Sequence, residues 1–424
     1  MADRLTLERH KQSSVRPASH PNDHGPVCIL APVFSGPPRL LSAQLFVLLL
    51  AGALGMAALG LALPVLPLAV DATTHNRATT GLVTGAVAAF TIALELLSPG
   101  LLHRFPVRPL LVAAMLLQLV AMAGFAELRT LPAMLACGAL TGAGFGLLVT
   151  VTVAAVGALA PPARAGEAIG YFGLCASVPT ILGPPLALLL LDARGAGAVF
   201  LAGALTCAAA ILTTAFLRIA PPCPGASATG GAGVLAAMRS PGVLRVWLAF
   251  VCTTLTYGAA VSFTPFLLGT SGPGSAPVFL LVFGVTRMLG RMAAGRAIDR
   301  VGERQLALPS LALGALALVL LQLHAAPAAA ISAAVWGAAF GVVQTAAFVG
   351  MLRGAGHGRS AGVSGIWSVA VDAGIGGGAL GMGPVGSAIG LTRAFWLLPA
   401  LFALAFVLRL PGPTPNQLVG DAGP

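Results

Sequence analysis

A polar stretch reads Gly295-Arg-Ala-Ile-Asp299-Arg300-Val-Gly302-Glu-Arg304 and separates two long apolar runs. The same spacing recurs 196 positions earlier. There the positions of Gly295, Asp299, Arg300, Gly302 and Arg304 are occupied, in order, by Pro99, His103, Arg104, Pro106 and Arg108. The chain is therefore predicted to contain two copies of one unit.

The composition is that of a membrane protein. Hydrophobic residues make up 57% and charged residues 8% of the 424 residues, against about 45–50% and 25% in soluble domains. Alternation typical of membrane strands is absent, so we predict an all-α membrane protein. Twelve runs are long enough to cross a bilayer as helices, near 41–63, 80–102, 109–126, 132–159, 168–191, 197–217, 245–269, 276–295, 305–323, 328–351, 361–388 and 394–410.

The net charge of +11 reflects membrane topology and does not indicate nucleic-acid binding. Of the 23 Lys and Arg residues, 18 fall on the side of the N-terminal tail, four fall on the opposite side and Arg287 lies within a span. Cytoplasmic loops carry the excess of basic residues. We expect a multi-pass protein of the plasma (inner) membrane with both termini in the cytoplasm.

The longest interruption between spans divides the twelve into six and six. It is rich in Pro, Gly, Ala and Ser from Pro221 to Gly233, as expected of a linker. The predicted organisation is a disordered cytoplasmic tail at 1–38, a six-helix bundle at 39–218, a cytoplasmic linker at 219–243, a second bundle at 244–410 and a cytoplasmic tail at 411–424.

Two acidic residues, Glu95 and Asp372, fall well inside apolar runs. A carboxylate near the bilayer centre costs about 2.5–3.5 kcal/mol on insertion scales, so it is a functional candidate. An apolar environment disfavours the charged form, which suits a residue that binds and releases a proton. Both are candidates for proton coupling, although a structural hydrogen bond for Glu95 and a structural ion pair for Asp372 remain alternatives.

Arg287 and Arg291 lie one turn apart in the eighth span, and Arg291 is the equivalent of Glu95 in the second copy. We predict these arginines to be the charge partners of Asp372. The remaining polar residues of the spans are uncharged, which favours lipophilic, neutral or singly cationic substrates.

The polar stretch is predicted to be a gating loop. Gly295 and Gly302 supply the backbone freedom for a reversal. Asp299 can accept hydrogen bonds from Arg300, from Arg304 or from a nearby helix start, and so hold the two bundles together on the inner side. The alternative is a solvated loop whose arginines only set topology.

The pattern G-x-x-x-D-R-x-G-x-R between the eighth and ninth spans resembles the signature loop of the major facilitator superfamily (MFS) of transporters. The first copy departs from it at His103 and Pro106, while Arg104 and Arg108 keep its basic character. The run Leu63-Pro64-Val65-Leu66-Pro67 ends the first span and fits the same resemblance.

The fifth span carries Leu182-Gly183-Pro184-Pro185, preceded by Pro179. This run is similar to the helix-kink signature of that superfamily's proton-driven antiporters, although the closing glycine pair is replaced by Leu186-Ala187. Thr141 stands where the fourth span of the family has an arginine.

The resemblance implies two pseudo-symmetric six-helix bundles that work by alternating access. It also implies a central cavity lined by the first, fourth, seventh and tenth spans with parts of the second, fifth, eighth and eleventh. Substrate-binding candidates on these spans are Tyr257, Trp336, Gln344, Trp367, Gln44 and Thr141.

We expect a secondary transporter that exports a small amphiphilic compound, such as a drug or metabolite, in exchange for protons, and that works as a monomer. A proton-coupled importer of a sugar, metabolite or metallophore is the alternative, and a non-transporting sensor is a remote one. An ATP-driven pump is excluded because the chain has one lysine, Lys11, and no phosphate-binding loop. The histidines lie in tails or loops and the cysteines are scattered, so no enzyme, metal site or cofactor is expected.

Overall fold

The computed structural model describes residues 42–128, 130–160, 164–218, 238–355 and 360–410. Over these residues the chain is helical and contains no strand. The helices are α1 (Ala43–Ala62), α2 (Leu66–Thr74), α3 (Arg77–Arg104), α4 (Val107–Glu127), α5 (Leu131–Leu159), α6 (Ala165–Arg194), α7 (Ala196–Thr214), α9 (Pro241–Leu268), α10 (Ala276–Val301), α11 (Glu303–Leu321), α12 (Ala326–Ala355), α13 (Ser360–Ile389), α14 (Leu391–Ala394) and α15 (Leu397–Arg409).

The described helices form twelve apolar segments long enough to cross a membrane. This confirms the all-α membrane fold and the number of spans. The two predicted tails and most of the predicted linker lie outside the described residues. The linker's last part is helical, because α9 begins at Pro241.

Two predicted span ends differ from the structure. The first span turns at residues 63–65 and continues as α2, because Pro67 fits the first turn of a new helix. The eighth span reaches Val301, so Gly295, Asp299 and Arg300 are helical and do not form a loop. The chain reverses at Gly302 alone, whose φ of 97° is accessible to glycine without a steric cost.

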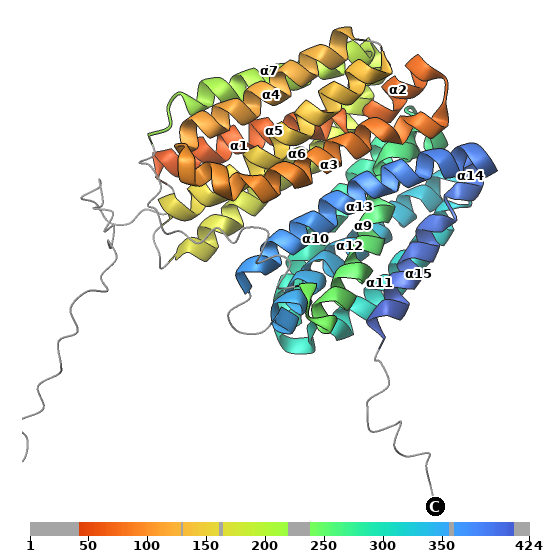
Figure 1. Ribbon diagram of the computed structural model, residues 1–424. Coiled ribbons are helices and arrows are strands. Elements are labelled where there is room, and N and C mark those ends of the chain that lie inside the picture. The colour runs from red at the N-terminus through yellow and green to blue at the C-terminus, as the bar shows by residue number, and fades with distance from the viewer. Residues whose placement is uncertain (1–41, 129, 161–163, 219–237, 356–359, 411–424) are drawn as a thin grey trace, which may run out of the picture. The chain divides into compact units, whose positions relative to one another are not determined.

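The helices pack as two groups, α1 to α7 and α9 to α15 (Figure 1). The repeat seen in the sequence recurs in the packing. In the first group, Gly142 and Gly146 of α5 bring their backbones against Val87 and Thr91 of α3.

In the second group, Gly337 and Gly341 of α12 lie in the same way against Phe283 and Arg287 of α10. Phe283 and Arg287 follow Val87 and Thr91 by the 196 positions that separate the two polar stretches. The two groups are therefore built on one helix-packing pattern, with glycines at matched positions where the backbones of α5 and α3, and of α12 and α10, approach closely.

Two long helix pairs join the groups. Helix α3 packs against α13, and α6 packs against α10. We call these the α3/α13 seam and the α6/α10 seam. In the first, Gly376 lies against Ala88, and a side chain at Gly81 would overlap the backbone of Ala379. In the second, Gly284 lies against Ile181.

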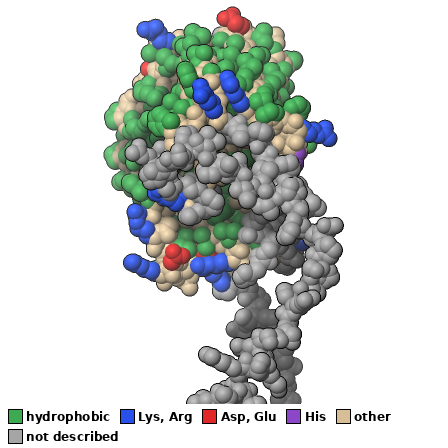
Figure 2. All heavy atoms as spheres, turned by 90° about the vertical axis from the view of Figure 1, so that its left-hand side faces the viewer, with side chains coloured by type: hydrophobic (Ala, Val, Ile, Leu, Met, Phe, Trp, Pro, Cys, Tyr) green, Lys and Arg blue, Asp and Glu red, His purple; other side chains and the backbone are tan. Residues whose placement is uncertain are grey.

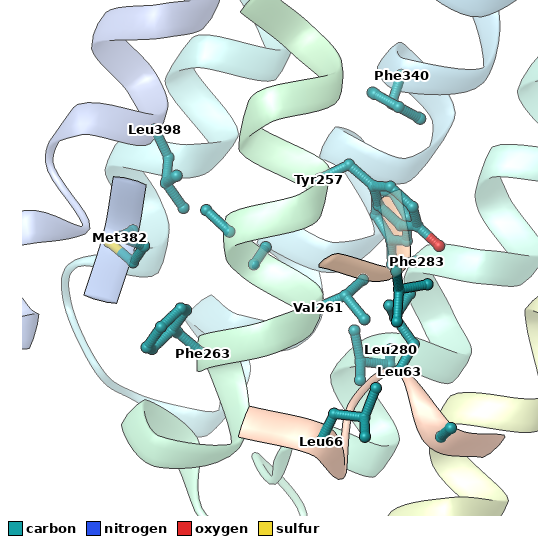
Figure 3. Packing of buried hydrophobic residues seen from close by; sticks show 14 of the residues in the cluster. Leu63, Leu66, Tyr257, Val261, Phe263, Leu280, Phe283, Phe340, Met382 and Leu398 are labelled. Atoms are coloured by element: carbon teal, nitrogen blue, oxygen red, sulfur yellow. The ribbon is translucent and has the colours of Figure 1, made fainter. Parts of the chain in front are cut away.

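Apolar packing also runs between the groups. Leu63 and Leu66, around the turn between α1 and α2, belong to one buried cluster with Val261 of α9 and Leu280 of α10. Figure 3 shows these side chains close together. Because α2 packs against α9, this buried cluster joins the two groups of helices around the α1–α2 turn.

An even number of spans places the start of α1 and the end of α15 at one end of the molecule, here called the terminal end. The inter-bundle contacts gather toward the opposite end. There, Asp192 at the close of α6 accepts hydrogen bonds from Thr270 at 3.3 Å and Ser271 at 3.1 Å. Among the described residues, hydrogen bonds that join the two groups run from Glu95 and Asp372 through Arg287 and Thr180 to this end. The structure is thus closed at the end opposite the termini.

Candidate functional site

Glu95 and Asp372 face each other across the α3/α13 seam. Their carboxyl groups come from different bundles and share a side-chain hydrogen bond. The second oxygen of Glu95 is buried and has no partner among the described residues. The structure therefore brings together the two residues that the sequence marked as proton-coupling candidates.

The surroundings of this pair are uncharged. Helix α5, which packs against α3, contains no charged residue from Leu131 to Leu159. The other helices packed on α3 and α13 carry charges only near their ends, at Asp71, Arg245, Arg353 and Arg393. The glycine spacing on α5 places Thr150 level with Glu95, but the Thr150 hydroxyl donates to the Gly146 carbonyl at 3.0 Å. Among the described side chains, each carboxyl thus has only the other as a charged neighbour.

The predicted charge partners of Asp372 are wrong. Within the described residues, Asp372 forms no ion pair with Arg287 or Arg291. The reason is geometric, because α10 lies on the α6/α10 seam and presents its arginines there. Arg287 donates to the Thr180 hydroxyl of α6 at 3.1 Å, and Arg291, one turn nearer the terminal end, is exposed.

Arg287 lies over aromatic rings. Its guanidinium carbon is 5.3 Å from the centroid of Tyr257 and 6.0 Å from that of Phe283. A cation above a ring face is attracted by the ring quadrupole, by about 0.5–2 kcal/mol. Arg287 is only 9% exposed. Among the described residues, its buried charge is therefore stabilised by these two rings and one hydroxyl.

The rings belong to a larger cluster. Tyr257 stacks between Phe283 at 5.5 Å and Phe340 at 5.4 Å, and Phe283 lies 4.2 Å from Trp336. Figure 3 shows Tyr257 beside Phe283 with Phe340 on its other side. Two predicted substrate contacts, Tyr257 and Trp336, are therefore in one apolar cluster next to Arg287.

Two polar atoms near this cluster have no partner. The indole nitrogen of Trp336 and the side-chain oxygen of Gln344 are buried, and among the described residues nothing bonds to them. Buried polar atoms are normally hydrogen-bonded. Both residues therefore stay candidates for contact with a polar substrate group. Trp367 donates to the Gln344 carbonyl at 3.4 Å and stacks on Phe250.

Gln44 and Thr141 form hydrogen bonds within the first bundle. The Gln44 side chain accepts from the Arg218 backbone at 2.7 Å and donates to the Phe216 carbonyl at 3.5 Å, so it ties the start of α1 to the end of α7. The buried Thr141 hydroxyl donates to the Cys137 carbonyl of its own helix at 2.9 Å. In this conformation both side chains form hydrogen bonds within the first bundle, and their role as substrate contacts stays a prediction.

The predicted gating residues are not joined in this conformation. Asp299 and Arg300 are exposed, and among the described residues Asp299 has no hydrogen bond or ion pair. Arg304 instead donates to the Arg409 carbonyl at 3.1 Å, and Glu303 pairs with Arg409. Both contacts stay within the second bundle. In the first copy, His103, Arg104 and Arg108 are likewise exposed.

The proline-rich motif of α6 lies at a close helix crossing. A side chain at Gly183 would lie 2.7 Å from the backbone of Gly60 on α1. Helix α6 continues past Pro179, Pro184 and Pro185, and Thr180 in the same stretch bonds Arg287. Sequence reasoning missed Thr180 as an arginine partner and Gly60 as the partner of Gly183. Neither had a signal beyond its place in an apolar run.

Comparisons with known proteins agree with the family resemblance seen in the sequence. Residues 48–379 match the Major Facilitator Superfamily. A chloramphenicol resistance protein of Streptomyces lividans is 33% identical over 257 residues, covering 57% of this chain and 64% of that protein. A probable sugar efflux transporter of Mannheimia succiniciproducens is 26% identical over 267 residues, covering 59% and 66%. The chain thus spans slightly less than two thirds of the length of these curated relatives.

Solved structures share the fold at low identity. A bacterial homologue of the human lysosomal transporter Spinster superposes with a TM-score of 0.72 at 14% identity, over 88% of this chain and 97% of that one. The xylose transporter XylE of E. coli gives 0.68 at 16% identity, over 88% and 100%. Because the family match covers well over half of the chain, this multi-pass membrane protein belongs to the Major Facilitator Superfamily of transporters.

Proposed function

We propose that the protein exports a small amphiphilic compound, neutral or cationic, in exchange for protons, by alternating access between its two bundles. The observation that carries the proposal is the contact between Glu95 and Asp372 across the α3/α13 seam. A carboxyl from each bundle meets there, in a part of the molecule with no compensating cation among the described residues.

The coupling follows from the charge on this pair. Two carboxylates in contact repel each other, and an apolar environment strengthens the repulsion. One proton shared between them removes the repulsion and forms a hydrogen bond. A protonated pair therefore stabilises the seam as described here, whereas loss of the proton favours a state in which α3 and α13 have separated.

The direction and substrate class rest on different support. One curated relative is named for chloramphenicol resistance and another for sugar efflux, so we propose export. The aromatic cluster around Tyr257 offers stacking surfaces, while Trp336 and Gln344 offer one donor and one acceptor. A neutral aromatic compound with hydrogen-bonding groups suits these features, and chloramphenicol is the first probe to use.

We further propose that both termini lie in the cytoplasm and that one chain transports alone. Figure 2 looks at the side where α1 begins, and Arg side chains are spread over this face with few carboxylates. Basic residues favour the cytoplasmic side. With that orientation the described state faces inward. Asp299 would then act as a latch only in the outward-facing state, in which the terminal ends of the bundles meet.

The test is chloramphenicol accumulation in efflux-deficient bacteria expressing the chain, with and without a protonophore. We expect lower accumulation than in control cells and a return to the control level with the protonophore. Glu95→Gln should lose the effect at equal expression. Glu127→Gln removes an equal charge from the exposed end of α4 and should keep it, which makes it the matched control.

Other outcomes separate the alternatives. Higher accumulation than in control cells would favour import. Lower accumulation that a protonophore does not change would remove proton coupling from the account. Full activity in Glu95→Gln would exclude the carboxyl pair as the proton carrier.

A further inference from the structure

The second bundle has a cleft of about 200 Å³ at its terminal end. It lies where α9 and α11 begin and α15 ends, with Gly242 and Val246 on one wall and Leu408 and Leu410 on another. Three arginines line it: Arg245, Arg304 and Arg409. This cleft is separate from the Glu95 and Asp372 pair and plays no part in the proposed transport mechanism.

The charges of the cleft do not cancel. Its one carboxylate, Glu303, pairs with Arg409. Arg304 uses its Nε to bond the Arg409 carbonyl at 3.1 Å, which leaves its terminal nitrogens for another acceptor. Arg245 is exposed and forms no ion pair with any described residue. The lining therefore carries two more positive charges than negative ones.

Helix ends add to this positive field. Helices α9 and α11 both begin at the cleft, and the first N–H groups of a helix have no partner within it. Together with the helix dipole they favour a negative group at such an end. Guanidinium groups and helix N-termini are both typical ligands of phosphate oxygens.

The flank of the cleft is apolar. Along α9 and α15, which pack against each other, Leu244, Leu248, Leu404 and Val407 are exposed, Val407 by 57%. They continue from the cleft along the two helices toward the middle of the bilayer. A ligand with a phosphate at one end and acyl chains at the other would satisfy the arginines and cover this surface, whereas a free anion would satisfy only the arginines.

We propose that the cleft binds the phosphodiester headgroup of an anionic phospholipid from the leaflet at the terminal end. The arginines hold the phosphate, and the acyl chains lie along the exposed faces of α9 and α15. Basic clefts between membrane helices bind anionic headgroups in this way. A bound lipid would link the starts of α9 and α11 to the end of α15.

The test is lipid binding to the purified full chain in detergent, followed by native mass spectrometry with phosphatidylglycerol. Phosphatidylcholine with the same acyl chains and inorganic phosphate are the comparison ligands. We expect phosphatidylglycerol to bind about ten-fold more tightly than phosphatidylcholine, because phosphatidylcholine carries the same phosphodiester next to a trimethylammonium cation that the two uncompensated arginines repel. Inorganic phosphate should not compete at millimolar concentration.

Two variants test the site itself. Arg245→Gln should weaken phosphatidylglycerol binding about ten-fold, because one charge-assisted contact to the phosphate is lost. The matched control is Arg218→Gln, which removes an exposed arginine at the end of α7 and should bind as wild type. Gly242→Phe fills the cleft without changing a charge, and a side chain at Gly242 meets no atom within 4 Å. It should also weaken binding while the protein stays folded.

Several results would overturn the proposal. If phosphatidylcholine bound as tightly as phosphatidylglycerol, the site would not distinguish lipids by the net charge of the headgroup. Competition by inorganic phosphate would indicate a site for free anions. Wild-type affinity in both Arg245→Gln and Gly242→Phe would place any bound lipid elsewhere on the protein.

Discussion

The α3/α13 seam and the α6/α10 seam are equivalent places in the two halves, yet they carry opposite chemistry. Helices α3 and α10 are related by the 196-residue repeat, and each crosses to the other bundle. On α3 the polar group is Glu95, which meets a second carboxyl at Asp372. On α10 it is Arg287, which meets the hydroxyl of Thr180 and two aromatic rings.

The difference separates two tasks. A carboxyl pair changes its charge when a proton binds, so the stability of its seam depends on pH. A guanidinium keeps its charge throughout the accessible pH range, so the α6/α10 seam does not respond to protons. One seam is therefore suited to coupling, and the other to holding the bundles together and to contact with substrate.

The largest effect is expected from removing the titratable pair. Glu95→Gln and Asp372→Asn should each lower proton-driven chloramphenicol transport about 10²- to 10⁴-fold in proteoliposomes, the scale on which removal of a proton-transfer group acts. The double variant should be no worse than either single one, because both residues act through one proton. Glu127→Gln serves as the control. Additive losses would show that the two carboxyls work independently.

The next effect comes from the packing of the same seam. Gly81→Ala places a methyl group against the backbone of Ala379, and overpacking costs about 1–3 kcal/mol. Each 1.4 kcal/mol of this cost to the described state should raise the relative population of the state that is open at the end opposite the termini about ten-fold. The distance between spin labels at Ala72 and Leu323 should lengthen. Gly100→Ala, on the same helix with open space around it, should leave the distance unchanged.

Arg287→Gln should lower transport without changing its pH dependence. The variant loses the Thr180 hydrogen bond and the cation–π contacts, worth about 1–2 kcal/mol together. A fall of about ten-fold in kcat/KM follows. Arg287→Lys keeps the charge and loses the planar group, so its kcat/KM should lie between those of the wild type and Arg287→Gln. A shifted pH profile in Arg287→Gln would contradict the division between the seams.

The smallest effects are expected at the two ends. Asp192 bonds Thr270 and Ser271 in the described state, whereas Asp299 is exposed and unpaired there among the described residues. Asp192→Asn should therefore favour opening at the end opposite the termini, and Asp299→Asn should favour the described state. Surface charges contribute about 0.2–1 kcal/mol, so each should change turnover only about 1.4- to five-fold. If both variants shifted the conformational equilibrium equally and in the same direction, Asp192 and Asp299 would not each stabilise a different state.

Much of the fold was predictable because it depends on local patterns. Hydropathy set the twelve spans, and the repeated polar stretch set the two halves. The 196-residue offset between those stretches also relates the residues of α3 and α10 against which the glycines of α5 and α12 pack. Errors fell at Pro64, where the span turns and continues as a second helix, and at Gly295, where the same helix continues to Val301.

The site was predictable as residues but not as contacts. Glu95 and Asp372 stood out because carboxyls are rare in apolar spans. Their pairing depends on the register of α3 against α13, which no local pattern records, so Arg287 and Arg291 were assigned to Asp372 in error. The hydrogen bonds of Gln44 were unpredictable for a related reason, since its partners at Phe216 and Arg218 lie far away in the sequence.

The most direct test of the account is the spin-label distance between Ala72 and Leu323 as a function of pH, in a background without the native cysteines. Raising the pH should remove the proton shared by Glu95 and Asp372, separate the α3/α13 seam and lengthen this distance in the wild type. The Glu95→Gln, Asp372→Asn double variant should show one distance at every pH. The same pH-dependent lengthening in the double variant would contradict the claim that this pair carries the proton.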